Sequence, residues 1–281
     1  MTGVGLFSDV HGNRQALAAI ARIVHRRTDL RWICLGDIVG WFFRPVECVL
    51  AVRDLAGKGL LSNVLLGNHD LMALGRFADM SHMTDRMLAT AYSAGALEHS
   101  PAALDYLRTL NETVIEGDSW IAAHHSPFGE GAPPHPPTAA AYGSIERDLP
   151  EQLADWSRCG KPVVLTGHGH VASVFGLPPS TLRPAMSDVK VWRADRQSAR
   201  TTIPIEPGWR YWIRNGTVGG PYLDGIVGAQ WTEYVPGEMI ILHREEYDTA
   251  EIRSDIAGHH HLMTQRDTWQ QKMIAMLDRT A

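Results

Sequence analysis

The sequence predicts an α/β fold in which a mainly parallel sheet is followed by a second sheet of antiparallel strands. Two patterns in the 281 residues support this. Between residues 4 and 125, short apolar runs bounded by glycine, typical of buried strands, alternate with segments of helical periodicity. Strands separated by helices indicate βαβ units. After residue 171 the chain changes to short β segments punctuated by Gly and Pro, as in antiparallel meanders.

The first half of the chain is expected to contain four helices and one long loop. Helices are expected at 14–26, from residue 45 onward, at 84–94 and at 101–110, from apolar residues at helical spacing or a proline at the first helical position. Residues 127–143 hold five prolines, which predicts a loop of the kind that forms lids or binding sites.

The second half is expected to contain two helices and several strands. One helix covers 144–158, where Pro150 is a candidate break, and an amphipathic helix is expected at 265–277. The strands are expected at 171–175, 189–192, 209–213, 229–235 and 239–243. We expect them to form a sheet of their own, packed on the first.

Composition excludes several classes of protein. The net charge is −5, from 26 basic and 31 acidic residues, and there is no basic stripe of the kind that binds duplex nucleic acid. Three cysteines, far apart and odd in number, indicate a reducing compartment without disulfides. No secretory signal or membrane-length apolar run is visible. These observations predict a cytoplasmic protein that does not bind membranes.

Five apolar runs each end in one or two small residues and then in a metal-binding side chain. These side chains are Asp9 with His11, Asp37, Asn68 with His69 and Asp70, His124, and His168 with His170. Ligands of open α/β sheets bind beyond the carboxyl ends of the strands, so we expect these residues to converge on one edge of one sheet. Asp, Asn and His together suit a pair of divalent cations.

Two neighbouring cations need a shared ligand, and Asp37 is the expected bridge because each of its carboxylate oxygens can bind one metal. The other ligands divide into two sets. The first is Asp9, His11 and His170, and the second is Asn68, His124 and His168. Water held between the cations would become a hydroxide nucleophile near neutral pH, and the net charge of +1 left at the site suits a phosphate. His69 is expected to protonate the leaving oxygen, which is worth about 10²–10⁴ in rate.

These motifs resemble those of the calcineurin-like metallophosphoesterases. They are Asp9-Val10-His11-Gly12-Asn13, Gly36-Asp37, Gly67-Asn68-His69-Asp70, His124 and Gly167-His168-Gly169-His170. The flanking residues and the segment 214–221 are similar to the small bacterial branch of predicted phosphodiesterases. The resemblance implies a four-layer αββα sandwich, with two mixed sheets flanked by helices and a dinuclear metal site at the carboxyl edge of the strands. It also implies the ligand roles given above and His69 as the proton donor.

The resemblance covers residues 4 to about 245, which predicts a single domain over 1–245 and a C-terminal extension with a helix over 246–281. Residues 177–205 resemble an insertion. Residues 38–41 lack the Asp-Arg pair of protein Ser/Thr phosphatases, which argues against that branch. His125 replaces the usual glycine after His124. Arg214, Asn215 and Tyr222 depart from the branch's segment, so no phosphate contact is carried over to them.

Several other residues have two interpretations. Asp70 is a helix cap or outer hydrogen-bond partner in preference to a metal ligand. Residues 41–44 either form an aromatic wall over the site, with Arg44 on a phosphate, or pack against the following helix. Asn13 and His125 are candidates for supporting the ligands or contacting substrate, and His135 is expected in a solvated loop. Residues 259–261, three consecutive histidines, are expected in a polar loop and not in a metal site.

The sequence thus predicts a phosphoester hydrolase with two divalent cations (Mn, Fe, Zn or Ni), acting as a phosphodiesterase on a small or nucleotide-type substrate. A phosphatase acting on monoesters, phosphoproteins or dinucleoside polyphosphates is one alternative. A non-catalytic scaffold with the same fold is another. The oligomeric state stays open.

Overall fold

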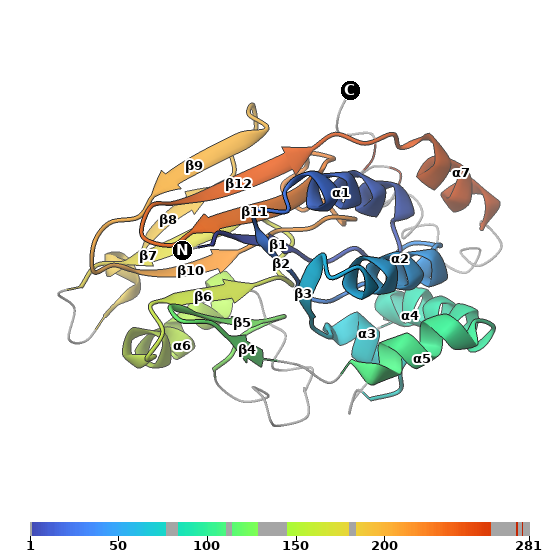
Figure 1. Ribbon diagram of the computed structural model, residues 1–281, viewed down its shortest axis with the longest axis horizontal. Coiled ribbons are helices and arrows are strands. Elements are labelled where there is room, and N and C mark those ends of the chain that lie inside the picture. The colour runs from blue at the N-terminus through green and yellow to red at the C-terminus, as the bar shows by residue number, and fades with distance from the viewer. Residues whose placement is uncertain are drawn as a thin grey trace.

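Two six-stranded mixed sheets pack face to face and carry helices on their outer faces (Figure 1). The computed structural model describes residues 2–76, 84–110, 114–128, 145–179 and 184–259, together with Ile274 and Leu277. This arrangement confirms the predicted four-layer αββα sandwich.

The first sheet has the strand order β3-β2-β1-β11-β12-β9. Its strands are β1 (Val4–Phe7), β2 (Arg31–Cys34), β3 (Leu61–Val64), β9 (Arg200–Pro204), β11 (Ala229–Val235) and β12 (Met239–Glu245). The strands β1, β2 and β3 run parallel, and β11 joins β1 antiparallel. Because successive side chains of a strand point to opposite faces, Leu6 enters the core between the sheets while Phe7 packs in the core under the helices.

The second sheet has the order β4-β5-β6-β10-β7-β8. Its strands are β4 (Val114–Glu116), β5 (Trp120–Ala123), β6 (Val163–Thr166), β7 (Ser173–Leu177), β8 (Lys190–Arg193) and β10 (Arg210–Arg214). Here β5, β6 and β10 run parallel. Leu165 and Ile213 face the core between the sheets, and Trp212 faces the outer layer.

The helices form the two outer layers. They are α1 (Arg14–Arg26), α2 (Pro45–Gly57), α3 (Asn68–Ala73), α4 (Thr84–Glu98), α5 (Pro101–Thr109), α6 (Ile145–Arg158) and α7 (Ala250–Gly258), with a short 3₁₀ helix at Met186–Asp188. The core under α1, α2, α4 and α5 includes Trp32 and Trp231 of the first sheet. On the second sheet, Leu153 and Trp156 of α6 pack against Trp212. None of the helices in the described ranges is long and apolar enough to cross a bilayer.

Several sequence predictions need correction. The antiparallel strands do not form a sheet of their own, because β9, β11 and β12 extend the first sheet and β7, β8 and β10 extend the second. The segment 177–205 supplies edge strands β8 and β9 to the two sheets, and β9 was not predicted. The helices α3 and α7 were not predicted either. Pro150 does not break α6. Most of 265–277 and of 127–143 lies outside the described residues.

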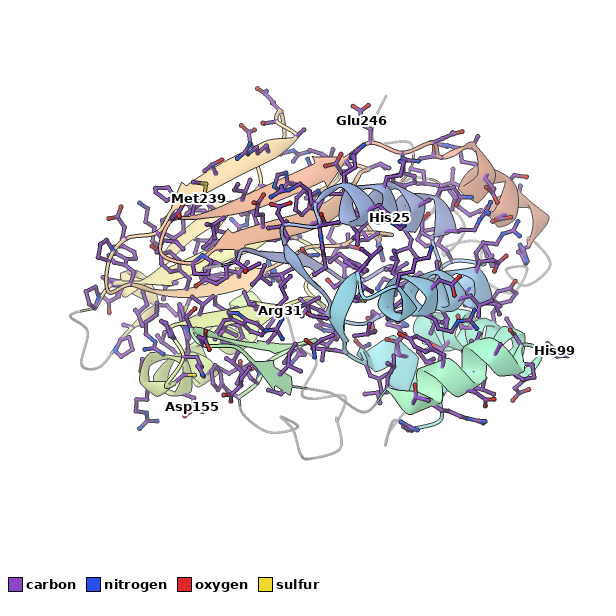
Figure 2. The ribbon with its side chains drawn as sticks, viewed as in Figure 1. His25, Arg31, His99, Asp155, Met239 and Glu246 are labelled. Atoms are coloured by element: carbon purple, nitrogen blue, oxygen red, sulfur yellow. The ribbon has the colours of Figure 1, made fainter. Side chains whose placement is uncertain are left out.

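The register of the strands identifies the edge that carries the predicted ligands. The strand β12 begins at Met239 and ends just before Glu246. These two residues therefore mark the two opposite ends of the strands in the first sheet (Figure 2). Val4 of β1 pairs with Arg31 of β2 on one side and with Tyr234 of β11 on the other. Because Tyr234 lies at the end of β11 that is beside Met239, Val4 also lies at the Met239 end of the sheet. The carboxyl ends of β1 and β2 therefore lie at the edge where β12 ends.

Candidate metal centre

The predicted ligands converge where the carboxyl ends of five strands meet. Asp9 and His11 follow β1, Asp37 follows β2, Asn68 opens α3 after β3, His124 follows β5, and His168 and His170 follow β6. The expectation that one sheet holds them all is wrong, because β5 and β6 belong to the second sheet. The two sheets pack face to face, so loops from both meet at a common edge.

Five of these residues have a left-handed backbone conformation. They are Asp9, His11, Asp37, His168 and His170, with φ between 52° and 61°. No other non-glycine residue in the described ranges has a positive φ. Such a conformation costs about 1–3 kcal/mol at each residue and tends to persist at functional sites. Hydrogen bonds between loops hold it here, for example from Asp9 N to Gly36 O at 2.9 Å and from His11 N to Asp37 O at 2.9 Å.

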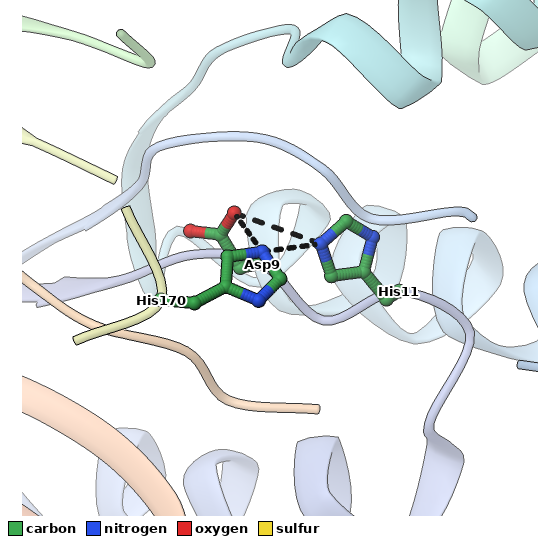
Figure 3. A group of neighbouring side chains, drawn as sticks. All are labelled: Asp9, His11 and His170. Carbon is green, nitrogen blue, oxygen red and sulfur yellow. Dashed lines mark hydrogen bonds and ion pairs between the residues drawn. The ribbon is translucent and has the colours of Figure 1, made fainter. Parts of the chain in front are cut away.

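Asp9, His11 and His170 form the first ligand group (Figure 3). The Nε2 atoms of the two histidines are 3.0 Å apart. Asp9 Oδ1 lies 3.2 Å from His170 Nε2 and 3.6 Å from His11 Nε2. Three donor atoms from two separate loops thus point at a common position, as a bound cation requires.

The hydrogen bonds around this first group leave the donor atoms available for a cation. His11 Nδ1 lies 3.2 Å from Val39 O and His170 Nδ1 lies 2.9 Å from Pro221 O. A carbonyl can only accept, so each Nδ1 carries the proton and each Nε2 keeps a lone pair. Asp9 Oδ1 is buried and, within the described part of the chain, has no hydrogen-bond partner. A cation would satisfy this oxygen.

Asn68, His124 and His168 form the second group. Asn68 Oδ1 lies 3.2 Å from His124 Nε2 and 3.0 Å from His168 Nδ1. His124 Nδ1 donates to Leu35 O at 2.9 Å, so Nε2 is the nitrogen that faces the site and that would give up its proton to bind a cation. Amide oxygen and imidazole nitrogen suit the same range of divalent metals as the first group.

A single oxygen of Asp37 faces both groups. Its Oδ2 lies 3.6 Å from His11 Nε2 and 3.3 Å from His124 Nε2. Its Oδ1 accepts a hydrogen bond from His69 N at 2.8 Å. In this structure one oxygen, Oδ2, faces both groups, whereas the sequence argument expected one oxygen toward each; the sharing of Asp37 between two cations stays a prediction.

The charges of the buried groups offset one another in the metal-free chain. Burial raises the pKa of Asp9 and Asp37, but the histidines around them outweigh this effect and hold both carboxyls below their usual range. Burial lowers the pKa of His124, yet the Asp37 carboxylate raises it to about 9. Burial and the neighbouring histidines lower the pKa of His168. Without cations, the negative charge of the carboxylates is thus balanced by the histidines paired with them.

His69 lies against both Asp37 and His11. It lies in the first turn of α3, and its ring meets the His11 ring edge to face at 4.8 Å between centroids. His11, Asp37 and His69 form a third cluster whose donor atoms lie within 4.8 Å of one another. The geometry therefore allows His69 to serve as a proton donor beside the ligands or as a ligand itself.

The sequence model of the calcineurin-like phosphoesterase family matches residues 3–176, which contain every one of these ligands. The chain belongs to this family. It is accordingly a phosphoester hydrolase of the metallophosphoesterase type, as the sequence motifs predicted.

Other proteins share the fold along most of the chain. The crystal structure of a metallophosphoesterase from Sphaerobacter thermophilus is 25% identical, with a TM-score of 0.69, and the match covers 98% of this chain and 99% of that one. A hypothetical protein from Pyrococcus horikoshii shows the same fold at 16% identity and a TM-score of 0.56, covering 94% and 97% of the two chains. An uncharacterized protein of Methanocaldococcus jannaschii is 27% identical over 247 residues, 87% of this chain and 88% of that protein.

Glycines beside the ligands let the ligand loops approach one another. A Cβ on Gly67 would collide with the carboxylate of Asp37. Gly40 has a φ of 139°, and a Cβ there would lie 2.6 Å from His11 Nδ1 and 2.9 Å from His69 Nδ1. Gly40 was not among the predicted site residues, because nothing in its local sequence marks contact with two distant histidines.

Substitution of Gly40 by alanine is expected to displace both histidines and to strain the backbone. We expect a loss of about 1–3 kcal/mol in the free energy of unfolding and a fall in kcat/KM of at least about tenfold, since small misplacements of catalytic groups are costly. The matched control is Gly95→Ala in α4, where a Cβ meets nothing within 4 Å and alanine should stabilise the helix. Equal thermal melting and turnover for both variants would contradict this expectation.

Asp70 and Asn13 hold the ligand loops from outside. Asp70 Oδ1 accepts from Ile38 N at 2.9 Å and Val39 N at 3.0 Å, and its Oδ2 accepts from Gly67 N at 3.0 Å. Burial and the Asp37 charge raise the pKa of Asp70 to about 7. Asn13 caps α1 by accepting from Ala16 N at 3.1 Å, and its amide donates to Gly219 O at 3.0 Å.

Arg44 does not face the ligands. Its guanidinium forms a bidentate pair with Asp255 of α7, at 2.7 Å (Nε) and 2.5 Å (Nη2), so the hypothesis that Arg44 contacts a phosphate is wrong for this structure. Phe42 and Phe43 are buried in a cluster with residues of α4 and α7, whereas the packing interpretation expected them on α2, the helix that follows them. Trp41 instead lies near His69, with 5.9 Å between the ring centroids.

The other predicted histidines differ in position. His125 lies beside His168, with 5.0 Å between the rings, and borders the second ligand group. His259 stacks on Phe43 with 4.1 Å between the rings. His135, His260 and His261 lie outside the described residues. The residues that sequence reasoning missed act mainly through backbone carbonyls, as Leu35 does, and no side-chain pattern signals such a role.

Proposed function

We propose that this phosphoesterase binds two divalent cations and hydrolyses phosphodiesters of small or nucleotide-type alcohols. The observation that carries the proposal is Asp37 Oδ2, which faces both ligand groups at 3.6 Å and 3.3 Å. A carboxylate oxygen in this position suits two cations held side by side. When bound, the cations would neutralise charge on the phosphate and lower the pKa of water.

In this proposal some residues of the chain would bind the cations, and His69 would donate a proton. Asp9, His11 and His170 would hold one cation, Asn68, His124 and His168 the other, and Asp37 both. Water adds its oxygen to phosphorus and releases a proton to solvent, and the bond from phosphorus to the leaving oxygen breaks. The leaving oxygen keeps that electron pair and takes a proton from His69, so an alcohol is released. The buried, prearranged ligands would hold the cations, and the cations the phosphate, without reorganisation during the reaction.

The charge at the site supports a phosphodiester as substrate. Asp9 and Asp37 cancel only part of the charge of two divalent cations, so the site attracts an anion. The arginine expected nearest the phosphate, Arg44, is paired with Asp255. A diester carries one negative charge fewer than an ionised monoester, and it therefore needs less help from such an arginine.

Turnover of bis-p-nitrophenyl phosphate against p-nitrophenyl phosphate tests this function. With added Mn²⁺ we expect the diester to have the higher kcat/KM, and we expect chelation followed by dialysis to abolish turnover until metal is restored. Mn, Fe, Zn and Ni all suit the N and O ligands, so each is tested in turn. Preference for the monoester would indicate a phosphatase. Bound metal without turnover of either ester would indicate a scaffold.

A further inference from the structure

Residues 41–44 lie between the ligand site and the C-terminal helix α7, and contacts fix this segment on both sides. On the side of α7, Arg44 pairs with Asp255 through two hydrogen bonds. Asp255 is itself only 8% exposed. A bidentate pair of arginine with a mostly buried carboxylate is a strong and directional contact. The position of Arg44 therefore depends on α7.

Aromatic contacts hold the neighbouring residue. The ring of His259, just after α7, lies parallel to the Phe43 ring at 4.1 Å between centroids and 5° between planes. The hydroxyl of Tyr92 in α4 donates to Phe43 O at 3.2 Å. Ile252 and Ile256 of α7 pack in the same buried cluster as Phe43. The C-terminal extension thus contacts Phe43 as well as Arg44 and holds both in position.

The ligand loops fix the other end of the segment. Phe42 N donates to His11 O at 2.7 Å, and Ser93 Oγ of α4 donates to Gly40 O at 3.3 Å. Trp41 lies between these anchored residues, so its backbone has little freedom. Its side chain remains partly exposed, and its ring is 5.9 Å from the His69 ring at an angle of 46°.

We propose that Trp41 is a preformed contact for an aromatic leaving group and that the C-terminal extension holds it in place. This rests on the proposed role of His69 as the donor of a proton to the leaving oxygen. The leaving oxygen must then lie next to His69, and the first group attached to it lies within reach of the adjacent indole. A planar ring, as in an aryl or nucleoside ester, stacks on an indole, whereas an alkyl group does not. Because the segment is already ordered, the contact requires little loss of conformational freedom on binding.

Two diesters whose leaving alcohols are matched in acidity test the proposal, one aryl and one fluoroalkyl. For Trp41→Leu we expect kcat/KM of the aryl ester to fall about tenfold, mainly through KM, while the fluoroalkyl ester changes less than about twofold. Trp41→Phe should keep most of the aryl preference. Binding of the free phenol, measured by calorimetry in the metal-loaded protein, should weaken in Trp41→Leu and not in Trp41→Phe.

Weakening the contacts of the C-terminal extension with Phe43 and Arg44 should have the same effect as replacing Trp41. Asp255→Asn removes the charge that holds Arg44, and we expect it to lower the aryl preference as Trp41→Leu does. Ser254→Ala, at an exposed neighbouring position of α7, should retain wild-type preference. Thermal melting checks that each variant is folded.

The possible results separate this proposal from the function on which it rests. If the wild-type enzyme hydrolyses both esters but Trp41→Leu slows them equally, or leaves both unchanged, the leaving-group contact is refuted. An unchanged aryl preference in Asp255→Asn refutes the role of the extension. Failure of the wild-type enzyme to hydrolyse either ester, with metal bound, contradicts the phosphoesterase function itself.

Discussion

Replacement of Asp37 by asparagine is expected to give the largest loss of activity of any single substitution in this protein. Asp37 Oδ2 faces His11 and His124 in separate ligand groups, at 3.6 Å and 3.3 Å between the atoms. Asparagine can still accept from His69 N through its carbonyl, but its amide group would then point N–H bonds at the two histidines. These N–H bonds would occupy the nitrogen lone pairs that a cation needs.

We expect this Asp37→Asn variant to bind fewer metal ions per chain, measured by elemental analysis after dialysis. Its kcat/KM should fall by at least about 10³-fold, beyond the 10–100-fold that loss of an outer-shell partner typically causes. Asp54→Asn is the matched control, because Asp54 is an exposed carboxylate of α2 that pairs with Arg53. Full metal content and turnover in the Asp37 variant would show that the two groups do not share this ligand.

Substitution of His69 by alanine is expected to lower turnover, and the loss should be larger for esters whose leaving group is more basic. Loss of a general acid typically costs about 10²–10⁴ in rate. Esters of weakly acidic alcohols should lose about this much, because their leaving oxygen cannot depart without a proton. The p-nitrophenyl esters should lose less, since p-nitrophenolate is stable as an anion.

The metal content of the His69→Ala variant decides between the two roles that the geometry allows. His69 belongs to a cluster with His11 and Asp37, so it has the position of a possible ligand as well as of an acid. Retained metal with a steep dependence on the leaving group supports the acid. Lost metal with a uniform loss for all esters supports a ligand. His25→Ala, at an exposed position of α1 (Figure 2), is the control for removal of a histidine.

The types of the candidate ligands and their order along the chain were readable from the sequence for a chemical reason. A buried parallel strand must be apolar, and the residue after it lies at the edge of the sheet where ligands bind. Asp9, Asp37 and His124 each follow such a run, and each lies in the site. The alternation of strands and helices before residue 125 indicated α/β architecture for a similar reason, because hydrophobic periodicity is a local property.

The division of strands between the sheets was not readable, because short strands of similar composition can pair with several partners. The strand β9 joins β12, and β8 joins β7, at the outer edges of two different sheets. An exposed edge strand carries polar residues that resemble a loop, as the mostly exposed residues of the unpredicted strand β9 do. The helix α7 was missed because few apolar residues mark its buried face.

The sequence by itself determined which residues can bind metal and in what order they reach the site. Tertiary structure decided how those residues act: that Asp37 faces both groups through one oxygen, that five ligands adopt a left-handed backbone, and that Arg44 turns from the site toward Asp255. Each of these features depends on the distance between segments far apart in the chain. Local composition and spacing carry no information about such distances, because only the packing of the two sheets and the C-terminal helix sets them.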